Sequence, residues 1–218
     1  MEKFTGIIFD IDGTLTSTNQ LIFAAFNHIA EKYLHKQFTD KEITEMFGPT
    51  EDVILKQLCP DNYDEVRKDY YDFYEQNHSM ADLYPGIAEI LDILKKKNVL
   101  LSIYTGKGRD ASIITLMKLK IYHYFDLIIT GDEVKEHKPS PEGITLFLEK
   151  FRLQKDNVLM VGDSPADIKA SRAAGVKVAS VIWDSYSKDA VLKLKPDYLF
   201  NSVGELKEFL QQHTHSLF

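Results

Sequence analysis

The chain has 218 residues, of which 44% are apolar and 27% charged, and its net charge is -7. This length and composition are typical of a soluble globular protein with one large or two smaller domains. The acidic balance excludes a general electrostatic attraction to nucleic acid or to an anionic membrane. The single cysteine, Cys59, excludes an internal disulfide, and we interpret it as a small apolar filler.

Residues 1–6 lack the basic start and the long apolar region of a signal peptide. No apolar run approaches the roughly 18 residues that are needed to span a bilayer. We therefore expect a cytoplasmic protein with no membrane partner and no nucleic-acid partner. Both a monomer and a homodimer are compatible with the sequence.

Apolar runs typical of strands alternate with amphipathic stretches of helical length. The predicted strands are Phe4–Phe9, Val99–Tyr104, Leu127–Thr130, Val158–Val161, Val176–Ile182 and Tyr198–Phe200. The predicted helices are Ile87–Lys97, Ala111–Lys120, Pro141–Phe151, Ala166–Ala174 and Val203–Gln211. This alternation predicts an α/β fold with a doubly wound, Rossmann-like parallel sheet that is covered by helices on both faces.

The first predicted strand ends in two aspartates, Asp10 and Asp12, followed by Gly13. Open α/β sheets bind their ligands at the carboxyl ends of the strands. Two carboxylates this close repel each other, so their clustering indicates a bound cation or a chemical task. A turn that uses only the Asp-Gly pair is the simpler alternative.

Residues 17–83 follow a different pattern, because helical periodicity replaces the strand-like runs. Four helices are expected there: one with an apolar stripe from Leu21 to Leu34, one capped by Thr39, and two at Glu51–Leu58 and Asp64–Gln76. No convincing strand is predicted in this span. We therefore expect a helical cap at 17–83, inserted into an α/β core that comprises 1–16 and 84–218. The two linkers between these parts form a plausible hinge.

Two later segments have groups that suit an anion such as phosphate. Thr105 and Gly106 follow the second long strand, where a hydroxyl and a backbone amide near a helix start favour an anion. Lys138 stands between the third strand and the next helix, where it can neutralise a phosphoryl oxygen. Each signal is weak alone, since glycine turns are common after strands and most lysines face water.

The strand Val158–Val161 repeats the arrangement of the first strand. It ends in Gly162 and Asp163, and Asp167 lies about one helical turn further on. The spacing of four residues allows Asp163 and Asp167 to face one point from a strand-to-helix junction. A second strand that ends in acids is hard to explain by turn chemistry alone.

In chain order, Asp-x-Asp-Gly-Thr, Thr-Gly, Lys-Pro and Gly-Asp-Ser-x-x-Asp resemble the four motifs of the haloacid dehalogenase-like hydrolase superfamily. The resemblance covers essentially the whole chain. The chain is most similar to the phosphoglycolate phosphatase-like branch, in which a helical cap follows the first motif. The first and fourth motifs are specific in combination, whereas the second and third depend on their context.

The resemblance implies a Mg²⁺-dependent phosphatase that acts on a small phosphorylated metabolite. Asp10 is the implied nucleophile, which forms an aspartyl-phosphate, and Asp12 the implied general acid and base. Thr105, Gly106 and Lys138 would stabilise the transferring group. The implied Mg²⁺ ligands are the carboxylates of Asp10 and Asp163 and the backbone carbonyl of Asp12, while Asp167 supports the metal indirectly or contacts it.

Two features depart from the resemblance or refine it. Lys107 follows Gly106 where relatives often have asparagine, and we expect it to face solvent or the cap. Residues 47–50, Phe-Gly-Pro-Thr, resemble a loop that sets specificity for the leaving group, in which Thr50 and Glu51 are candidate hydrogen-bonding residues. An ordinary helix N-cap at Thr50 is an equal alternative.

Several functions stay open at this level. The substrate expected first is a phosphoglycolate-like compound or a sugar phosphate, and inorganic pyrophosphate is an alternative. A beta-phosphoglucomutase-like phosphosugar mutase is disfavoured because Arg67 is the single arginine of the predicted cap. A dehalogenase is disfavoured by the presence of Asp12. A catalytically silent scaffold is disfavoured because unused buried acids would destabilise the fold.

Overall fold

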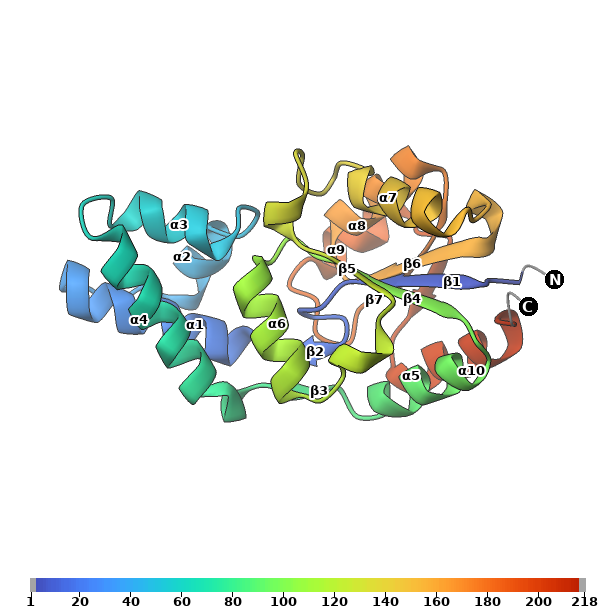
Figure 1. The fold of residues 1–218 in the computed structure, drawn as a ribbon, viewed down its shortest axis with the longest axis horizontal. Helices are drawn as coiled ribbons and strands as arrows, with labels where there is room; N and C mark the ends of the chain where they lie inside the picture. Colours follow the sequence, from blue (N-terminus) through green and yellow to red (C-terminus); the bar gives the residue numbers. More distant parts are fainter. Residues whose placement is uncertain (1–2, 216–218) are drawn as a thin grey trace.

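Six parallel strands form the central sheet of the computed structural model, which describes residues 3–215 (Figure 1). The strands are β1 (Gly6–Phe9), β4 (Leu100–Tyr104), β5 (Leu127–Ile129), β6 (Val158–Gly162), β7 (Lys177–Val181) and β8 (Tyr198–Phe200). Their order in the sheet is β5-β4-β1-β6-β7-β8. The predicted α/β fold with a parallel sheet is confirmed, and the strand ends differ from the predicted ones by at most two residues.

Strand β1 lies at the centre of the sheet. Its residue Ile7 pairs with Leu101 of β4 on one side and with Leu159 of β6 on the other. Ile7, Ile8 and Phe9 are fully buried, which explains why the apolar run is continuous rather than alternating. Because the chain places β4 and β5 on one side of β1 and β6 to β8 on the other, the carboxyl end of β1 is a switch point of the sheet.

Helices cover both faces of the sheet. Buried side chains of α5 (Ile87–Lys96), α6 (Arg109–Lys118) and α10 (Val203–His213) pack on one face with Ile7 and Phe9. Those of α7 (Glu142–Phe151) and α8 (Pro165–Ala174) pack on the other face with Ile8. Figure 1 shows α7 and α8 above the sheet and α5 and α10 below it.

One helix of the sheet part was not predicted from the sequence. This helix, α9 (Lys188–Leu194), has seven residues, and Val191 is its buried residue. Such a short helix has too few turns to produce a recognisable apolar stripe. Of the predicted helices, those at Ile87–Lys97, Ala111–Lys120, Pro141–Phe151, Ala166–Ala174 and Val203–Gln211 are all present, with ends that differ by at most two residues.

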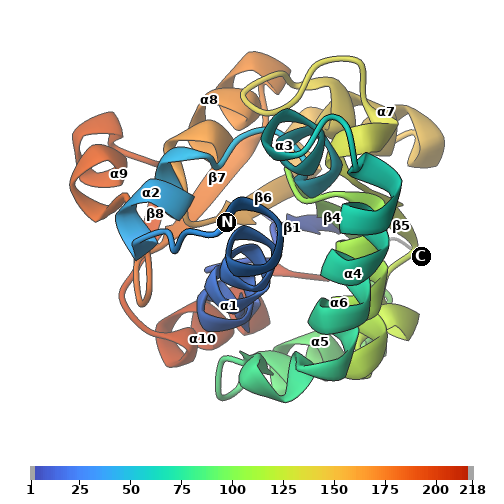
Figure 2. The same ribbon diagram turned by 90° about the vertical axis from the view of Figure 1, so that its left-hand side faces the viewer.

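A helical insertion lies between β1 and α5, and we use this name for residues 19–80. It contains α1 (Asn19–Ile29), a π-helical turn (Ala30–Leu34), α2 (Asp40–Glu45), α3 (Glu51–Leu58), α4 (Tyr63–Gln76) and a 3-10 turn (His78–Met80). The four predicted helices are all present, and Thr39 begins α2 through a capping box with Glu42. Figure 2 views the molecule from the side of this insertion.

Two short strands form where the chain enters and leaves the insertion. Strands β2 (Thr16–Ser17) and β3 (Asp82–Leu83) pair antiparallel, with Thr16 opposite Leu83. The prediction that residues 17–83 contain no strand was therefore wrong at both ends of that span. Two-residue strands have no detectable period, and these form only because the two crossings lie side by side.

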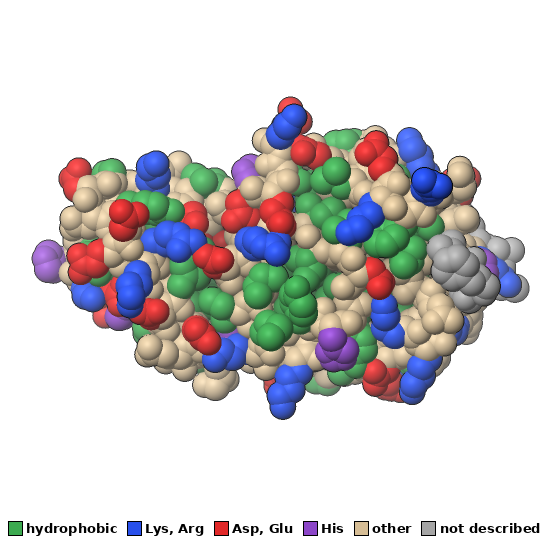
Figure 3. All heavy atoms as spheres, viewed as in Figure 1, with side chains coloured by type: hydrophobic (Ala, Val, Ile, Leu, Met, Phe, Trp, Pro, Cys, Tyr) green, Lys and Arg blue, Asp and Glu red, His purple; other side chains and the backbone are tan. Residues whose placement is uncertain are grey.

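Cys59 is buried in the apolar cluster of the insertion, and burial raises the pKa of its thiol. This environment agrees with the interpretation of Cys59 as an apolar filler. On the surface shown in Figure 3, acidic and basic side chains are interspersed. None of the helices formed by residues 3–215 combines the length and the apolar character that a membrane span requires.

Candidate active site

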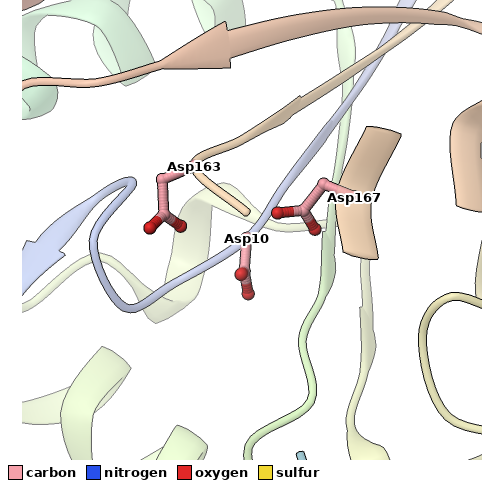
Figure 4. Close-up of side chains that lie close together, drawn as sticks. All are labelled: Asp10, Asp163 and Asp167. Atoms are coloured by element: carbon pink, nitrogen blue, oxygen red, sulfur yellow. The ribbon is translucent and has the colours of Figure 1, made fainter. Parts of the chain in front are cut away.

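Three aspartates from two neighbouring strands meet at the carboxyl edge of the sheet. Asp10 directly follows β1, and Asp163 directly follows β6, so the pairing of these strands brings the two residues together. Asp167 lies in the first turn of α8. One carboxylate oxygen from each of Asp10, Asp163 and Asp167 lies within 4.8 Å of the others. Figure 4 shows Asp163 and Asp167 on either side of Asp10.

The junction between β6 and α8 positions Asp167. Ser164 is the N-cap of α8, and its hydroxyl and backbone amide donate to Asp167 Oδ2 at 2.6 and 3.0 Å. This capping box turns the Asp167 carboxylate back under the end of β6. Gly162 makes room for it, since a Cβ at this position would lie 2.3 Å from Asp167 Cγ.

Lys138 joins two of the three aspartates. Its Nζ lies 3.1 Å from Asp10 Oδ2 and 2.7 Å from Asp167 Oδ1, and it also donates to the carbonyl of Tyr104 at 3.1 Å. Burial alone would lower the pKa of Lys138, but the two carboxylates outweigh burial and raise that pKa. The lysine is therefore a buried, fixed positive charge beside Asp10.

The electrostatics of the three aspartates suit a divalent cation. Burial raises the pKa of Asp10 to about 6, although Lys138 opposes this effect. Burial and repulsion from Asp10 and Asp167 raise the pKa of Asp163 well above its ordinary value, even though Thr14 donates to Asp163 Oδ1. Clustered carboxylate oxygens are ligands that Mg²⁺ prefers, and a cation would relieve this repulsion.

The three acids would contribute differently to such a site. Both oxygens of Asp167 are already engaged, one by Lys138 and the other by Ser164. Asp167 is thus suited to orienting Lys138 and the neighbouring groups, whereas Asp10 and Asp163 are suited to direct coordination. The chemistry of the donor set fits the Mg²⁺ that the sequence analysis implied.

The Asp12 carboxylate does not belong to this cluster. Thr18 donates to Asp12 Oδ1, and Lys107 Nζ lies 3.2 Å from Asp12 Oδ2. The expected contribution of Asp12 to metal binding through its backbone carbonyl stays a prediction. Its side chain is held separately from that of Asp10, which suits a different chemical role.

Lys107 is buried between the sheet part and the insertion. Its Nζ lies 3.1 Å from Glu51 Oε1, and its side chain is only 2% exposed. Glu51 also accepts a hydrogen bond of 2.7 Å from the backbone amide of Gly108. Of the two alternatives expected for Lys107, solvent or the cap, the structure shows the second, because Lys107 contacts Glu51 of the insertion.

Thr50 and Glu51, the candidate hydrogen-bonding residues of the predicted specificity loop, make other contacts in the structure. One carboxylate oxygen of Glu51 contacts Lys107 Nζ, and the other accepts a hydrogen bond from the Gly108 amide. Glu51 is therefore engaged within the protein and is not free to bind a leaving group. Thr50 occupies the N-cap position of α3, but its side chain makes no capping hydrogen bond. The sequence could not reveal the pair of Lys107 and Glu51, because these residues are far apart in the chain and lie in different structural parts.

The loop after β4 holds the remaining predicted phosphate-binding residues. Thr105 is buried, and its hydroxyl accepts a hydrogen bond from the Lys107 amide at 3.2 Å. The backbone of Gly106 packs against Gly131, where a Cβ would lie 2.4 Å from the Gly106 carbonyl oxygen. Gly131 thus helps to place this loop, a role that was not inferred from its sequence context.

A cleft of about 680 Å³ lies between the edge of the sheet and the insertion. It is lined by the predicted residues Asp10, Asp12, Thr105, Gly106, Lys138 and Asp163. Asp167 is not part of its lining but lies under the end of β6. Among the lining residues that the sequence analysis missed are Asp184 and Tyr186, from the segment after β7. These residues have no motif-like spacing that distinguishes them.

Comparison with known proteins agrees with this geometry. Residues 7–181 match the model of a family described as haloacid dehalogenase-like hydrolase. The pyrophosphatase PpaX of Bacillus pumilus is 33% identical over 201 residues, which cover 92% of this chain and 93% of that protein. PpaX of Bacillus velezensis is 32% identical over 206 residues, which cover 94% and 95%.

Solved structures show the same fold. The crystal structure of a predicted phosphoglycolate phosphatase from Haemophilus somnus superposes with a TM-score of 0.85 at 25% identity, covering 97% of this chain and 100% of that chain. A haloacid dehalogenase-like family protein from Streptococcus pneumoniae superposes with a TM-score of 0.78 at 25% identity, covering 97% and 100%. These matches and the arrangement of the four motifs place this chain in the haloacid dehalogenase-like hydrolase family.

Proposed function

We propose that the protein is a Mg²⁺-dependent phosphatase that hydrolyses a small phosphorylated metabolite through an aspartyl-phosphate intermediate. One observation carries this proposal. Asp10 lies beside Asp163, with which it is suited to hold a cation, and beside the fixed charge of Lys138, while Asp12, two residues away, lines the same cleft. The site thus combines a nucleophile, positive charge for a phosphoryl group and a separate acid.

The residues of the chain account for both steps of hydrolysis. A carboxylate oxygen of Asp10 attacks phosphorus, and the bond from phosphorus to the leaving oxygen breaks as Asp12 donates a proton to that oxygen. A water molecule then attacks the phosphorus of the aspartyl-phosphate. Asp12 takes a proton from this water, and phosphate leaves as the Asp10 carboxylate is regenerated.

The remaining groups stabilise charge on the phosphoryl oxygens. Lys138, the Thr105 hydroxyl and the Gly106 amide are the proposed donors. Bound Mg²⁺ would add positive charge beside the same oxygens and is proposed to bind the carboxylates of Asp10 and Asp163, with the Asp12 carbonyl as a further ligand. Lys107 is engaged by Asp12 and Glu51, so we assign it no direct contact with phosphate.

The substrates proposed first are phosphoglycolate-like compounds and sugar phosphates. Inorganic pyrophosphate is a second candidate, because relatives of this chain are named pyrophosphatase PpaX. The structure adds an argument against a phosphosugar mutase, which needs basic groups in the cap to hold a bisphosphate. Arg67 is bound to Asp52 and Asp110 and is not part of the cleft lining, and Lys41, the lysine of the insertion that does line the cleft, lies beside Glu45.

A substrate panel tests the function. We expect the purified protein to release phosphate from several phosphate esters when Mg²⁺ is present and to lose this activity when the metal is chelated. Asp10→Asn should reduce kcat by about a thousandfold or more, because the amide is not a competent nucleophile. The measurement is phosphate release under saturating substrate.

The control for this experiment is the fold of each protein, monitored by circular dichroism. A folded wild-type protein that releases no phosphate from any panel member with Mg²⁺ would support the scaffold alternative instead. Asp10→Asn with unchanged kcat would contradict the role assigned to Asp10.

A further inference from the structure

The two ends of the cleft differ in chemistry. The end beside β1 contains the acids and lysines described above, whereas the end formed by the insertion has an apolar part beside the polar and charged residues Lys41, Thr44 and Glu45. Ile22 and Phe26 of α1, Ile54 of α3 and the loop residue Phe47 line this second end. Phe47 is 43% exposed. A group attached to the phosphate would therefore contact hydrocarbon and aromatic surface.

A row of contacting aromatic side chains connects the apolar part of the insertion with the segment after β7. The ring of Phe23 stacks with that of Phe47 at a centroid distance of 6.5 Å and meets Tyr186 edge-on at 6.4 Å. Tyr186 is 65% exposed and lines the cleft from the segment after β7. Exposed aromatic rings that line a cleft favour contact with a weakly polar face of the ligand.

Negative charge dominates the lining of the cleft. Among the described residues that line it, six are acidic and three are lysines. The acids are Asp10, Asp12, Glu45, Glu51, Asp163 and Asp184, and the lysines are Lys41, Lys107 and Lys138. One bound Mg²⁺ would compensate for part of this excess, at the end where phosphate binds.

Each of these lysines already has a carboxylate partner. Lys138 lies beside Asp10, and Lys107 lies between Asp12 and Glu51. Lys41 lies 3.8 Å from Glu45 on the exposed surface of α2. A second negative group on the substrate would therefore lose hydration among acids without gaining an uncompensated cation.

We propose that the cleft selects phosphate monoesters whose leaving group is uncharged, and that it discriminates against inorganic pyrophosphate and against esters with a carboxylate. This inference rests on the phosphatase function proposed above. It separates the chain from the activity named for its PpaX relatives. It also narrows the candidate metabolites, because phosphoglycolate carries a carboxylate next to its phosphate ester.

Two esters of equal size test the proposal on the full-length protein with Mg²⁺. The substrates are 4-carbamoylphenyl phosphate and 4-carboxyphenyl phosphate, which differ in the charge of the leaving group, and inorganic pyrophosphate is the third. We expect kcat/KM for the carbamoyl ester to exceed the other two values by about tenfold or more. Equal values, or a preference for either of the other substrates, would overturn the inference.

Failure of the proposed function gives a different result, because none of the three substrates would then release phosphate with Mg²⁺. Two variants locate the discrimination in the cleft. Thr44→Lys adds a cation at a half-buried position on α2 that lines the cleft. This variant should increase kcat/KM for the carboxyl ester relative to kcat/KM for the carbamoyl ester. The matched variant Thr44→Gln adds bulk without charge and should change kcat/KM for both esters by the same factor.

Phe47→Ala tests the apolar part. It should raise KM for the carbamoyl ester several-fold with little change in kcat, because the aromatic surface binds the leaving group and not the phosphoryl group. Leu146→Ala removes a similarly exposed apolar side chain from α7, outside the cleft, and should change neither parameter. An unchanged KM in Phe47→Ala, or an unchanged ester ratio in folded Thr44→Lys, would overturn the proposal.

Discussion

Asp10 and Asp12 have different environments although they are two residues apart. Asp10 faces Lys138 and the acids that follow β6, whereas Asp12 is held by Thr18 and Lys107 at the boundary with the insertion. Two carboxylates whose surroundings differ in this way are suited to different chemical tasks. The proposed division between nucleophile and acid follows from this difference.

The raised pKa of Asp10 predicts how metal binding depends on pH. In the metal-free protein this pKa is about 6 in the folded state, against 3.8 for the ordinary group. The folded state therefore holds a proton more tightly between about pH 4 and pH 6 than the unfolded state does. The contribution of Asp10 to the free energy of unfolding falls as pH rises through this window, by about 3 kcal/mol in total.

Mg²⁺ should reverse this loss, because it competes with protons for the same carboxylates. We expect the Mg²⁺-induced rise in Tm to be small at pH 5 and clearly larger at pH 7.5. Thermal unfolding with and without Mg²⁺ at the two pH values measures the effect, and Asp10→Asn serves as the control with a weaker pH dependence. A Mg²⁺ effect of the same size at both pH values would contradict this account.

At the scale of elements, the site depends on how closely β6 approaches α8. Gly162 ends β6, and the absence of a side chain there leaves the space that the Asp167 carboxylate occupies. The capping box of α8 and the contact with Lys138 both use that carboxylate. The absence of a side chain at Gly162 therefore allows Asp167 both to cap α8 and to contact Lys138.

Gly162→Ala should therefore disturb the site. The added Cβ would lie 2.3 Å from Asp167 Cγ, so the carboxylate must move and its contact with Lys138 must change. We expect kcat/KM to fall by about a hundredfold, a size typical of a displaced supporting residue. Phosphate release from the best panel substrate provides the measurement.

Gly204→Ala is a matched control for this change. Gly204 lies in α10, where the nearest atom to an added Cβ is Ser202 Oγ at 3.8 Å. This variant should retain activity and stability. If Gly162→Ala were as active as Gly204→Ala, the position of Asp167 would not matter for catalysis.

At the scale of the whole molecule, the insertion and the sheet part are joined by more than their two short strands. Ala111 of α6 belongs to the apolar cluster of the insertion. The hydroxyl of Thr115, also on α6, forms hydrogen bonds with Tyr74 at 2.9 Å and with His78 at 3.2 Å. The buried pair of Lys107 and Glu51 adds a charged contact across the same boundary.

Removing one member of this pair should destabilise the fold strongly. Lys107→Met leaves Glu51 and Asp12 without their shared cation, and we expect a loss of about 3 kcal/mol in the free energy of unfolding. The double variant Lys107→Met/Glu51→Gln should lose less than the sum of the single changes, because Glu51 is then uncharged and only Asp12 is left without the cation. Urea unfolding measures all three variants.

An exposed lysine on the insertion provides the comparison. Lys41 is 85% exposed beside Glu45, and Lys41→Met should change the free energy of unfolding by less than about 0.5 kcal/mol. Strictly additive effects of the Lys107 and Glu51 changes would show that the two residues are not coupled across the boundary.

The sequence by itself determined the strands, most helices and the positions of the acids. A run such as Ile7 to Phe9 is buried on both faces wherever it forms a central strand, and a capping pair such as Thr39 and Glu42 acts within one helical turn. Asp10 and Asp163 follow their strands directly, so parallel pairing alone brings them together. These features depend on neighbouring residues or on one regular repeat.

Only the tertiary structure decided the partners that cross from one part of the molecule to another. The pairing of β2 with β3, the contact of Lys107 with Glu51 and the apolar part of the cleft all join residues from separate segments. No local periodicity encodes these contacts, because each depends on how the insertion packs against the sheet part. Lys107 therefore has the local pattern of a surface residue but lies buried, where Asp12 and Glu51 compensate its charge.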